Sequence, residues 1–439
     1  MLKIKGLLLT AAILALGGCA IYSPHPLPKA AEFAALKEDE VKQPLGMVEV
    51  AQLAVLRSPE LKIERQKKDV ATAQAFQAGL LPNPQANAGI DHPTDNAQGL
   101  FNGYSYGLSF DLLALITHPV DSAIATAKKK QAKKELLWQE WQTVAKAQLL
   151  YVQAQIAAQR VSFLSKAKSG LYLNAKAIKA AGANGDLAPD QAESDLAVLA
   201  DIQGQLSTAQ RQQITAFSDL KALLNLAPES ILELQELGAP KISDASQTDA
   251  ALKKVVERRP DLIALRDGYA AQEETVFKAI LSQFPNLQIG FTKARDTSDV
   301  HTTSFGVTLN LPLFDQGQGH IAIERVTRDQ LRAEYQDRIN QIHSTAEKLR
   351  SEDAIIAQRI NSLEPEIPTL KAHALKAAAS AKSGDLSLAL EMQFIQSWLT
   401  RQNELLDLRQ ALWTNTIALN TLLATPLQNA SPSDKDIHS

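Results

Sequence analysis

The sequence YSYGLSFD, at residues 104–111, alternates apolar or aromatic side chains with small polar ones. In a β-strand, successive side chains point to opposite faces, so Ser105, Ser109 and Asp111 share one face and the aromatic side chains share the other. A strand with one apolar and one polar face has two common settings. It covers a soluble core, or it belongs to a membrane barrel with lipid outside and water inside.

The same pattern returns 199 residues later, at residues 304–310, which read SFGVTLN. There Ser304, Thr308 and Asn310 form the polar face, and in a barrel both polar sets would face the lumen. A further alternating segment precedes each of these two. The sequence therefore predicts four strands, at about 85–91, 104–112, 287–293 and 303–311.

Other motifs repeat at nearly the same offset, which indicates an internal duplication. RSPEL at 57–61 matches RRPDL at 258–262, and the tripeptide Gly-Asp-Leu occurs at 185–187 and at 384–386. The predicted organisation is a first repeat at 46–227, a connector at 228–247, a second repeat at 248–425 and a disordered tail at 426–439.

Each repeat continues into a long helical hairpin. No proline occurs from Val120 to Ala181, a stretch that would give a helix of about 90 Å at 1.5 Å per residue. The helix is expected to turn near Gly185, and its counterpart near Gly384, because glycine accepts the left-handed conformation. Pro365 and Pro368 predict a break in the second long helix.

The predicted fold is mainly α with a small β part, in a duplicated unit of a strand hairpin and a long helical hairpin. Four strands cannot close a barrel, which needs at least about eight. Open strand edges are excluded from lipid because unpaired backbone groups cost several kcal/mol each. A membrane location would thus require several protomers to share one barrel, and helical hairpins this thin also need neighbours to bury their apolar stripes.

The N-terminus has the layout of a secretory signal. Lys3 and Lys5 precede an apolar run at residues 7–16, which is too short to span a bilayer. The run ends in Leu-Gly-Gly before Cys19, which resembles a bacterial lipobox. We expect a signal peptide at 1–18, an acylated Cys19 and a lipidated segment at 19–45, and the Ala that follows the cysteine favours the outer membrane.

Composition excludes several classes of function. The 439 residues include 45 basic and 48 acidic ones, so no basic excess supports nucleic-acid binding. The single cysteine excludes an internal disulfide and a cysteine-based zinc site. The histidines have no metal-ligand spacing and no nucleophile–base set is present, so we expect neither an enzyme nor a cofactor or metal site.

The ordered set of motifs resembles the TolC family of outer-membrane efflux proteins. It comprises the duplicated plan, the two RSPEL-type motifs, LLPNP at 80–84, LPLFDQG at 311–317 and the Gly-Asp-Leu turns. The resemblance implies a homotrimer in outer-membrane lipid, with a 12-stranded β-barrel continued by an α-helical periplasmic tunnel. It also implies two partners, a periplasmic adaptor (membrane fusion) protein and an inner-membrane pump, whose substrates leave through the tunnel.

The resemblance also assigns candidate site residues. The six residues of the two turns would contact the adaptor: Gly185, Asp186, Leu187, Gly384, Asp385 and Leu386. Their aspartates either cap the following helices or pair with basic adaptor side chains. At the expected periplasmic gate, where family members carry aspartates, this chain has Leu390 and Gln393. Only Glu391 offers a carboxylate there, which leaves an acidic, cation-selective gate open.

Two alternatives remain at this stage. The chain could be the exit duct of a type I protein secretion system, or a structural periplasmic coiled-coil lipoprotein with a small soluble β-domain. The repeated aromatic face of the hairpins favours a duct over the structural lipoprotein. The exported substrate (drug, metal cation or protein), the pump class, the cognate adaptor and the resting state of the gate stay open.

Overall fold

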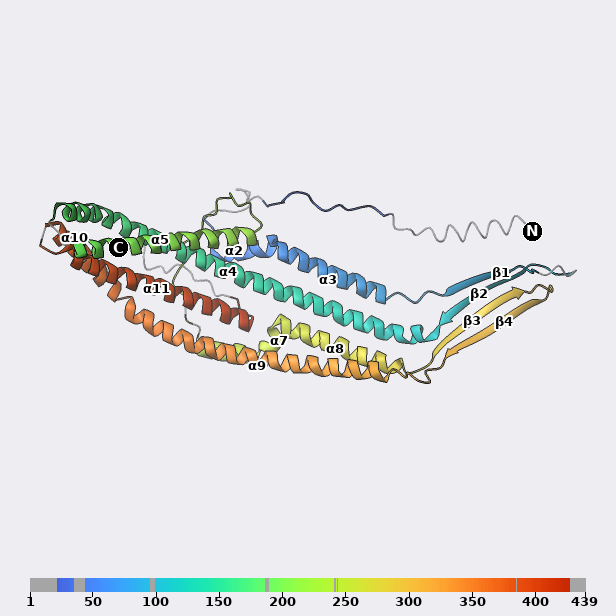
Figure 1. Cartoon of the computed structure of the whole chain (residues 1–439). Coiled ribbons are helices and arrows are strands. Elements are labelled where there is room, and N and C mark those ends of the chain that lie inside the picture. Colours follow the sequence, from blue (N-terminus) through green and yellow to red (C-terminus); the bar gives the residue numbers. More distant parts are fainter. Residues whose placement is uncertain are drawn as a thin grey trace.

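The computed structural model describes residues 22–34, 44–94, 99–185, 189–240, 242, 244–383 and 385–426. The signal segment, Cys19, Asp186, Leu187, Gly384 and the tail from 427 lie outside the described residues. The chain is long and narrow, with a small sheet at one end and the turns of the helical hairpins at the other (Figure 1). None of the described helices combines the length and the apolar character that a membrane-spanning helix requires.

One antiparallel sheet holds all the named strands, in the order β1-β2-β3-β4. Its strands are β1 (Gln85–Asp91), β2 (Gly103–Asp111), β3 (Asn286–Arg295) and β4 (His301–Asn310). The alternating segments therefore form the strands that their pattern predicts. Because β2 pairs with β3, the sheet is also where the two halves of the chain join.

The first half contains α2 (Met47–Arg57), α3 (Pro59–Ala78), α4 (Leu112–Asn184) and α5 (Pro189–Leu223). Ser58 caps α3 by accepting a hydrogen bond from the Leu61 backbone N–H at 3.5 Å, with proline at the first helical position. The 73 residues of α4 span about 110 Å at 1.5 Å per residue.

The start of α4 differs from the expectation that the helix begins at Val120. It begins at Leu112, directly after β2, and includes Pro119. Asp111 explains the early start, because its Oδ1 accepts a hydrogen bond from the Ala114 backbone N–H at 2.9 Å and caps the helix. Pro119 removes one backbone donor from the interior of the helix, and the helix continues through it.

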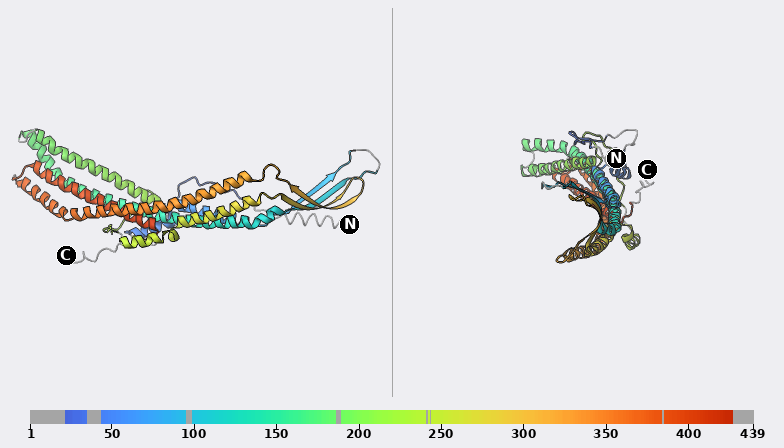
Figure 2. Two further views of the ribbon diagram at one scale, coloured as in Figure 1. Left: turned by 90° about the horizontal axis from the view of Figure 1, so that it is seen from below. Right: turned by 90° about the vertical axis from the view of Figure 1, so that its right-hand side faces the viewer.

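The second half contains α6 (Ala245–Lys253), α7 (Val255–Arg258), α8 (Pro260–Leu281), α9 (Gln318–Leu363), α10 (Glu366–Ser383) and α11 (Leu388–Leu423). The second long helix is interrupted between α9 and α10, at Glu364 and Pro365, as the prolines predict. Near the sheet, α3, α4, α8 and α9 lie side by side in that order. Seen along the molecule they form a curved wall (Figure 2).

A belt of connecting segments crosses this wall near its middle. Leu45 pairs with Leu234 of the connector, and Ala34 pairs with Leu226. The buried Tyr151 of α4 donates from its hydroxyl to the Gln235 carbonyl at 2.5 Å. Burial, with a smaller contribution from Glu49, raises the pKa of Tyr151 to about 12, so the hydroxyl stays a donor at neutral pH.

Candidate functional site

One face of the sheet is an uncovered surface that is apolar except toward the β3–β4 turn, where Lys293 and Arg295 stand opposite Tyr106 and Tyr104. Leu108 of β2 lies opposite Phe291 of β3, and Phe291 lies opposite Phe305 of β4. The rings of Phe291 and Phe305 meet edge to face with centroids 6.2 Å apart. The large side chains of this face are between 37% and 79% exposed: Ile90, Tyr104, Tyr106, Leu108, Phe110, Phe291, Phe305, Val307 and Leu309. A contiguous apolar face of this kind marks a membrane or protein contact.

The opposite face of the sheet is polar and built of small side chains. It carries Ser105, Ser109, Asp111, Ser304, Thr308 and Asn310. A Cβ at Gly107 would stand 2.9 Å from the Phe291 carbonyl oxygen, so this position has no room for a larger residue. The Asn286 side chain donates to Asp111 Oδ2 at 3.2 Å where this face meets the helices.

Both edges of the sheet and both edges of the helical wall are open within one chain. The sheet ends at β1 on one side and at β4 on the other. On the β1 side, Ile63 and Val70 of α3 are exposed and lie seven residues apart, which places them on one helix face. On the β4 side, Ile323 and Val326 of α9 are exposed. Unpaired strand edges flanked by exposed apolar side chains fit a neighbouring copy on each side.

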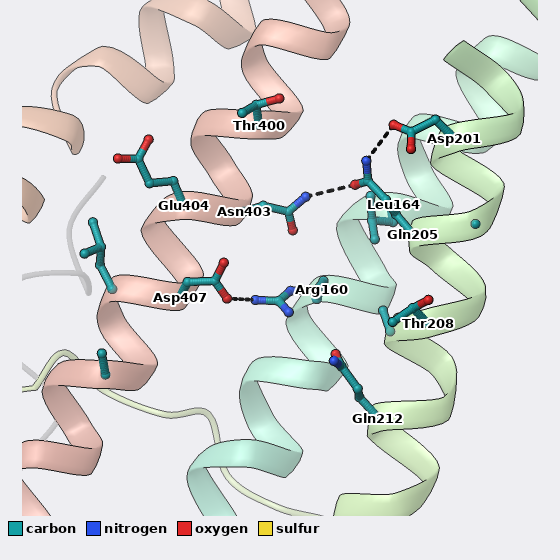
Figure 3. Close-up of a pocket in the computed structure, with 14 residues that line it drawn as sticks. Arg160, Leu164, Asp201, Gln205, Thr208, Gln212, Thr400, Asn403, Glu404 and Asp407 are labelled. Carbon is teal, nitrogen blue, oxygen red and sulfur yellow. Dashed lines mark hydrogen bonds and ion pairs between the residues drawn. The ribbon is translucent and has the colours of Figure 1, made fainter. Parts of the chain in front are cut away.

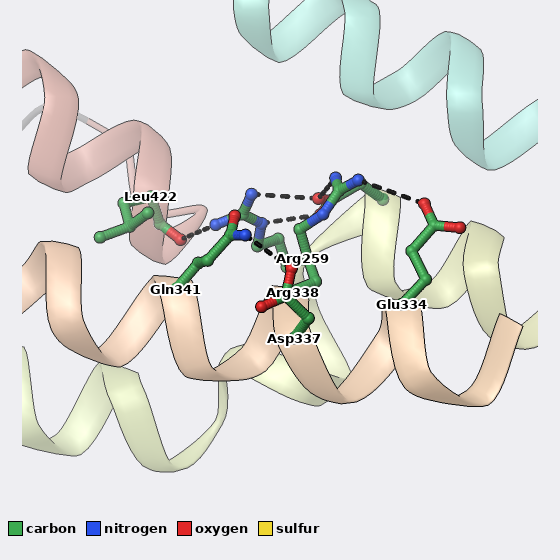
Figure 4. Close-up of polar contacts among 7 residues, drawn as sticks. Arg259, Glu334, Asp337, Arg338, Gln341 and Leu422 are labelled. Carbon is green, nitrogen blue, oxygen red and sulfur yellow. Dashed lines mark hydrogen bonds and ion pairs between the residues drawn. The ribbon is translucent and has the colours of Figure 1, made fainter. Parts of the chain in front are cut away.

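A buried charge cluster joins the second RSPEL-type motif to the end of α11 (Figure 4). Arg259 Nε and Nη2 donate to the two oxygens of Asp261 at 2.7 and 3.0 Å, and both residues are only 6% exposed. Arg259 Nη1 also donates to the Leu422 carbonyl at 3.1 Å, close to where α11 ends. Arg338 of α9 pairs with Asp261 at 3.0 Å. The cluster ties α8, α9 and α11 together.

At the second helical turn, the residue that caps the following helix is not the expected aspartate. Gly185 adopts the left-handed conformation, with a φ of 76°. Asp385 does not cap α11; Ser387 does, because its side chain accepts from the Leu390 backbone N–H. Asp385 instead accepts from Ser383 Oγ at 2.6 Å. Leu386 is half-buried.

The region of the expected gate presents no carboxylate at its surface. Leu390 is 40% exposed and Gln393 is exposed, whereas Glu391 is only 1% exposed. Glu391 lies next to the exposed positions of α11 in sequence, but on a different face of the helix. Its side chain is therefore buried between the helices. The exposed positions of this stretch are therefore uncharged.

A polar groove lies between the two hairpins, with α4 as its floor and α5 and α11 as its sides (Figure 3). Its volume is about 1060 Å³. Arg160 of α4 pairs with Asp407 of α11, and Gln205 of α5 accepts from Asn403 at 3.1 Å and donates to Asp201 at 2.8 Å. The sequence did not single out these residues, because they come from three helices and belong to no motif.

The two histidines beside the turns of the sheet, His92 and His301, lie apart from one another in the structure. Among the described residues no three His, Cys, Asp or Glu side chains are grouped as metal ligands. His92 hydrogen-bonds to Asn102 at 2.7 Å in the turn region beyond β1, and His301 lies 3.8 Å from Asp299 at the start of β4. Both histidines have side-chain partners at the end of the sheet that carries the turns.

The structure superposes on solved outer-membrane proteins over nearly its whole length. The outer-membrane channel OprN matches with a TM-score of 0.72 and 15% identity, covering 93% of this chain and 99% of OprN. CusC, a protein studied for transmembrane channel formation, matches with a TM-score of 0.70 and 16% identity, covering 93% and 100%. The open state of the Neisseria gonorrhoeae outer membrane channel MtrE matches with a TM-score of 0.68 and 15% identity, covering 93% and 99%.

No family model and no curated protein sequence matches the chain. At this level of identity the superpositions establish the fold, which is that of these outer-membrane channels. The predicted fold class, mainly helical with a small antiparallel sheet, is confirmed.

Proposed function

We propose that the protein is the outer-membrane channel of a tripartite efflux system. It would act as a passive trimeric exit duct that joins a periplasmic adaptor and an inner-membrane pump to the exterior. One observation carries the proposal: a sheet with an uncovered apolar face and two open edges continues into a helical wall with two open edges. A water-filled pore through a membrane needs a surface of this kind.

The proposed number of copies comes from the resemblance to the TolC family, and the strand count supports it. Three copies of a four-stranded sheet give 12 strands, in the size range of closed membrane barrels. In such a ring β4 of one copy pairs with β1 of the next, and α9 lies against α3. The exposed Val326 of α9 and Val70 of α3 then become buried at the seam.

The inside of the proposed duct is the polar face of the sheet. It carries Ser105, Ser109, Asp111, Ser304, Thr308 and Asn310, small side chains that leave the pore open. The far ends of the hairpins would meet the adaptor through the two Gly-Asp-Leu turns. Uncharged Leu390 and Gln393 support a gate region without an acidic ring.

Lipid anchoring through Cys19 is part of the proposal. From Ala34, at the belt, to Cys19 there are 15 residues, which span about 50 Å when fully extended. From Tyr151, at the belt, back to the start of α4 at Leu112 the helix covers about 58 Å. The described segment at 22–34 runs from the belt toward the sheet end (Figure 1). A fully extended segment would therefore bring Cys19 to within about 10 Å of the level at which α4 begins, close to the inner face of the outer membrane.

Labelling cells with a radioactive fatty acid tests the anchor. The protein should take up the label, and the Cys19→Ala variant should not, since no other cysteine is present. The variant is still expected to insert, because the barrel has its own apolar belt. Persistent acyl labelling of the variant would rule the anchor out.

Fractionation of cells tests the channel itself. Outer-membrane fractions should contain a heat-modifiable trimer that detergent, but not high salt, releases. A monomer that becomes soluble in the Cys19→Ala variant would instead identify a periplasmic structural lipoprotein.

A further inference from the structure

A carboxylic acid is buried in the helix pair that forms the second hairpin. Asp353 of α9 is 3% exposed and lies in the interface with α11. Apolar clusters pack along this interface on both sides of it. On one side are Ala346, Leu349, Leu419 and Leu423, and on the other Ile360, Leu363, Leu405 and Leu412. Cores of this kind accept a carboxylate only at a high cost in solvation.

Among the described residues packed around this acid, no cation acts on it. Along α11 no charged residue occurs from Gln410 to Leu423, and the polar side chains there include Asn415 and Thr416. On α9 itself the charge that acts on Asp353 is the adjacent Glu352, which lies 3.8 Å from Lys348. Arg350, on the preceding turn of α9, pairs with Glu347 at 2.6 Å and with Asp249 of α6 at 3.7 Å. The only net influence of charge on Asp353 is therefore repulsion by Glu352.

The hydrogen bonding of Asp353 is incomplete. Its Oδ1 is buried and has no donor in the part of the chain that the structure describes. The side chain of Asn415 hydrogen-bonds to Asp353. The same amide group also donates to Glu352 Oε2, at 3.5 Å. Burial raises the pKa of Asp353 above 3.8, repulsion from Glu352 raises it further, and the hydrogen bond from Asn415 opposes this only in part.

We propose that Asp353 makes the packing of α9 against α11 depend on pH. The neutral acid fits the apolar interface and holds the two helices together, whereas the carboxylate loosens them. Because the acid is harder to ionise in the packed state, its stabilising contribution is complete below about pH 4 and is lost as the pH rises. The inference concerns one chain and does not depend on the proposed transport function.

Hydrogen exchange of backbone amides tests this in the purified full-length protein. We compare residues 410–420 of α11 at about pH 4 and about pH 7, after correction for intrinsic exchange rates. In the unmodified protein, protection should fall toward pH 7, by up to about tenfold for each unit by which the pKa is raised. In Asp353→Asn, which keeps the shape without the charge, protection should stay constant.

Glu352→Gln is the matched control, since it removes the adjacent but more exposed carboxyl. This variant should retain a pH dependence that is reduced at most slightly. If Asp353→Asn does not assemble, Asp353→Leu supplies the same comparison without a titratable group. Equal pH dependence in the unmodified protein and in either Asp353 variant would overturn the proposal.

Discussion

Leu108 of β2 and Phe291 of β3 are direct partners across the sheet, and they belong to different halves of the chain. The apolar face is therefore continuous across the boundary between the halves. The polar face is continuous in the same way, because the neighbouring Ser109 pairs with Gly290. This shared two-faced surface is the basis of the proposed duct.

Charges on the two faces of β2 should have opposite consequences. Leu108→Lys places an ammonium against lipid and should cost about 2–4 kcal/mol near the bilayer midplane. Ser109→Lys, one residue away, places the same charge in water and should leave stability nearly unchanged while altering conductance. Thermal dissociation of the trimer measures the first effect and single-channel recording the second. Equal tolerance at both positions would mean that the faces are assigned wrongly.

Substitutions in the charge cluster at the start of α8 should lower the free energy of unfolding more than substitutions of exposed ion pairs. Asp261→Ala leaves Arg259 buried without its carboxylate, which costs about 3–5 kcal/mol for a buried ion pair. Glu60→Ala is the matched control at the equivalent position of the first half, where the carboxylate is exposed and meets Lys146 at 3.2 Å. It should cost less than about 1 kcal/mol. Urea unfolding measures the free energy of unfolding of both variants. Similar decreases in the two would show that the buried cluster stabilises the protein no more than the exposed ion pair does.

The uncharged gate region predicts weak block by trivalent cations from the periplasmic side. Gln393→Asp adds one exposed carboxylate per protomer, three in a trimer, and should strengthen the block by at least about tenfold. Thr414→Asp, exposed on the same helix but 21 residues away, should not. The concentration for half-block in planar bilayers gives the comparison. Strong block of the unmodified channel would point to an acidic ring elsewhere.

The two helical turns should be needed for export but not for assembly. Changing Leu187 and Leu386 together to Asp places charges at the far end of the hairpins, distant from the barrel. Export should be lost while trimers still form in the outer membrane. Asp385→Asn is a mild control, since its oxygen accepts a bond from Ser383 and does not cap α11. Full export by the double variant would locate the adaptor contact elsewhere.

Much of the fold could be predicted from the sequence because its signals are local. The alternation at 104–111 and 304–310 fixed both faces of the hairpins, and Pro365 marked the break between α9 and α10. Ser58 and Pro59, where α3 begins, are a local start signal of the same kind. The start of α4 could not be predicted in the same way. The proline-free stretch begins at Val120, but capping by Asp111 starts the helix sooner.

The candidate site was less predictable because it depends on contacts distant in sequence. The bond between Arg259 and the Leu422 carbonyl spans 163 residues, and the groove pair of Arg160 and Asp407 spans 247. Spacing from Gly384 placed Glu391 next to the gate. Its burial follows from how α11 rotates against its neighbours, which no local pattern specifies.

Recording from the purified protein in planar lipid bilayers tests the central claim most directly. The account predicts discrete conductance steps from a particle whose mass, measured in the same preparation, is three times that of one mature chain. It also predicts that Ser109→Lys changes the step size, because Ser109 would line the pore. A folded monomer that gives no conductance steps, or steps that Ser109→Lys leaves unchanged, would contradict the proposal that this sheet forms the wall of a trimeric duct.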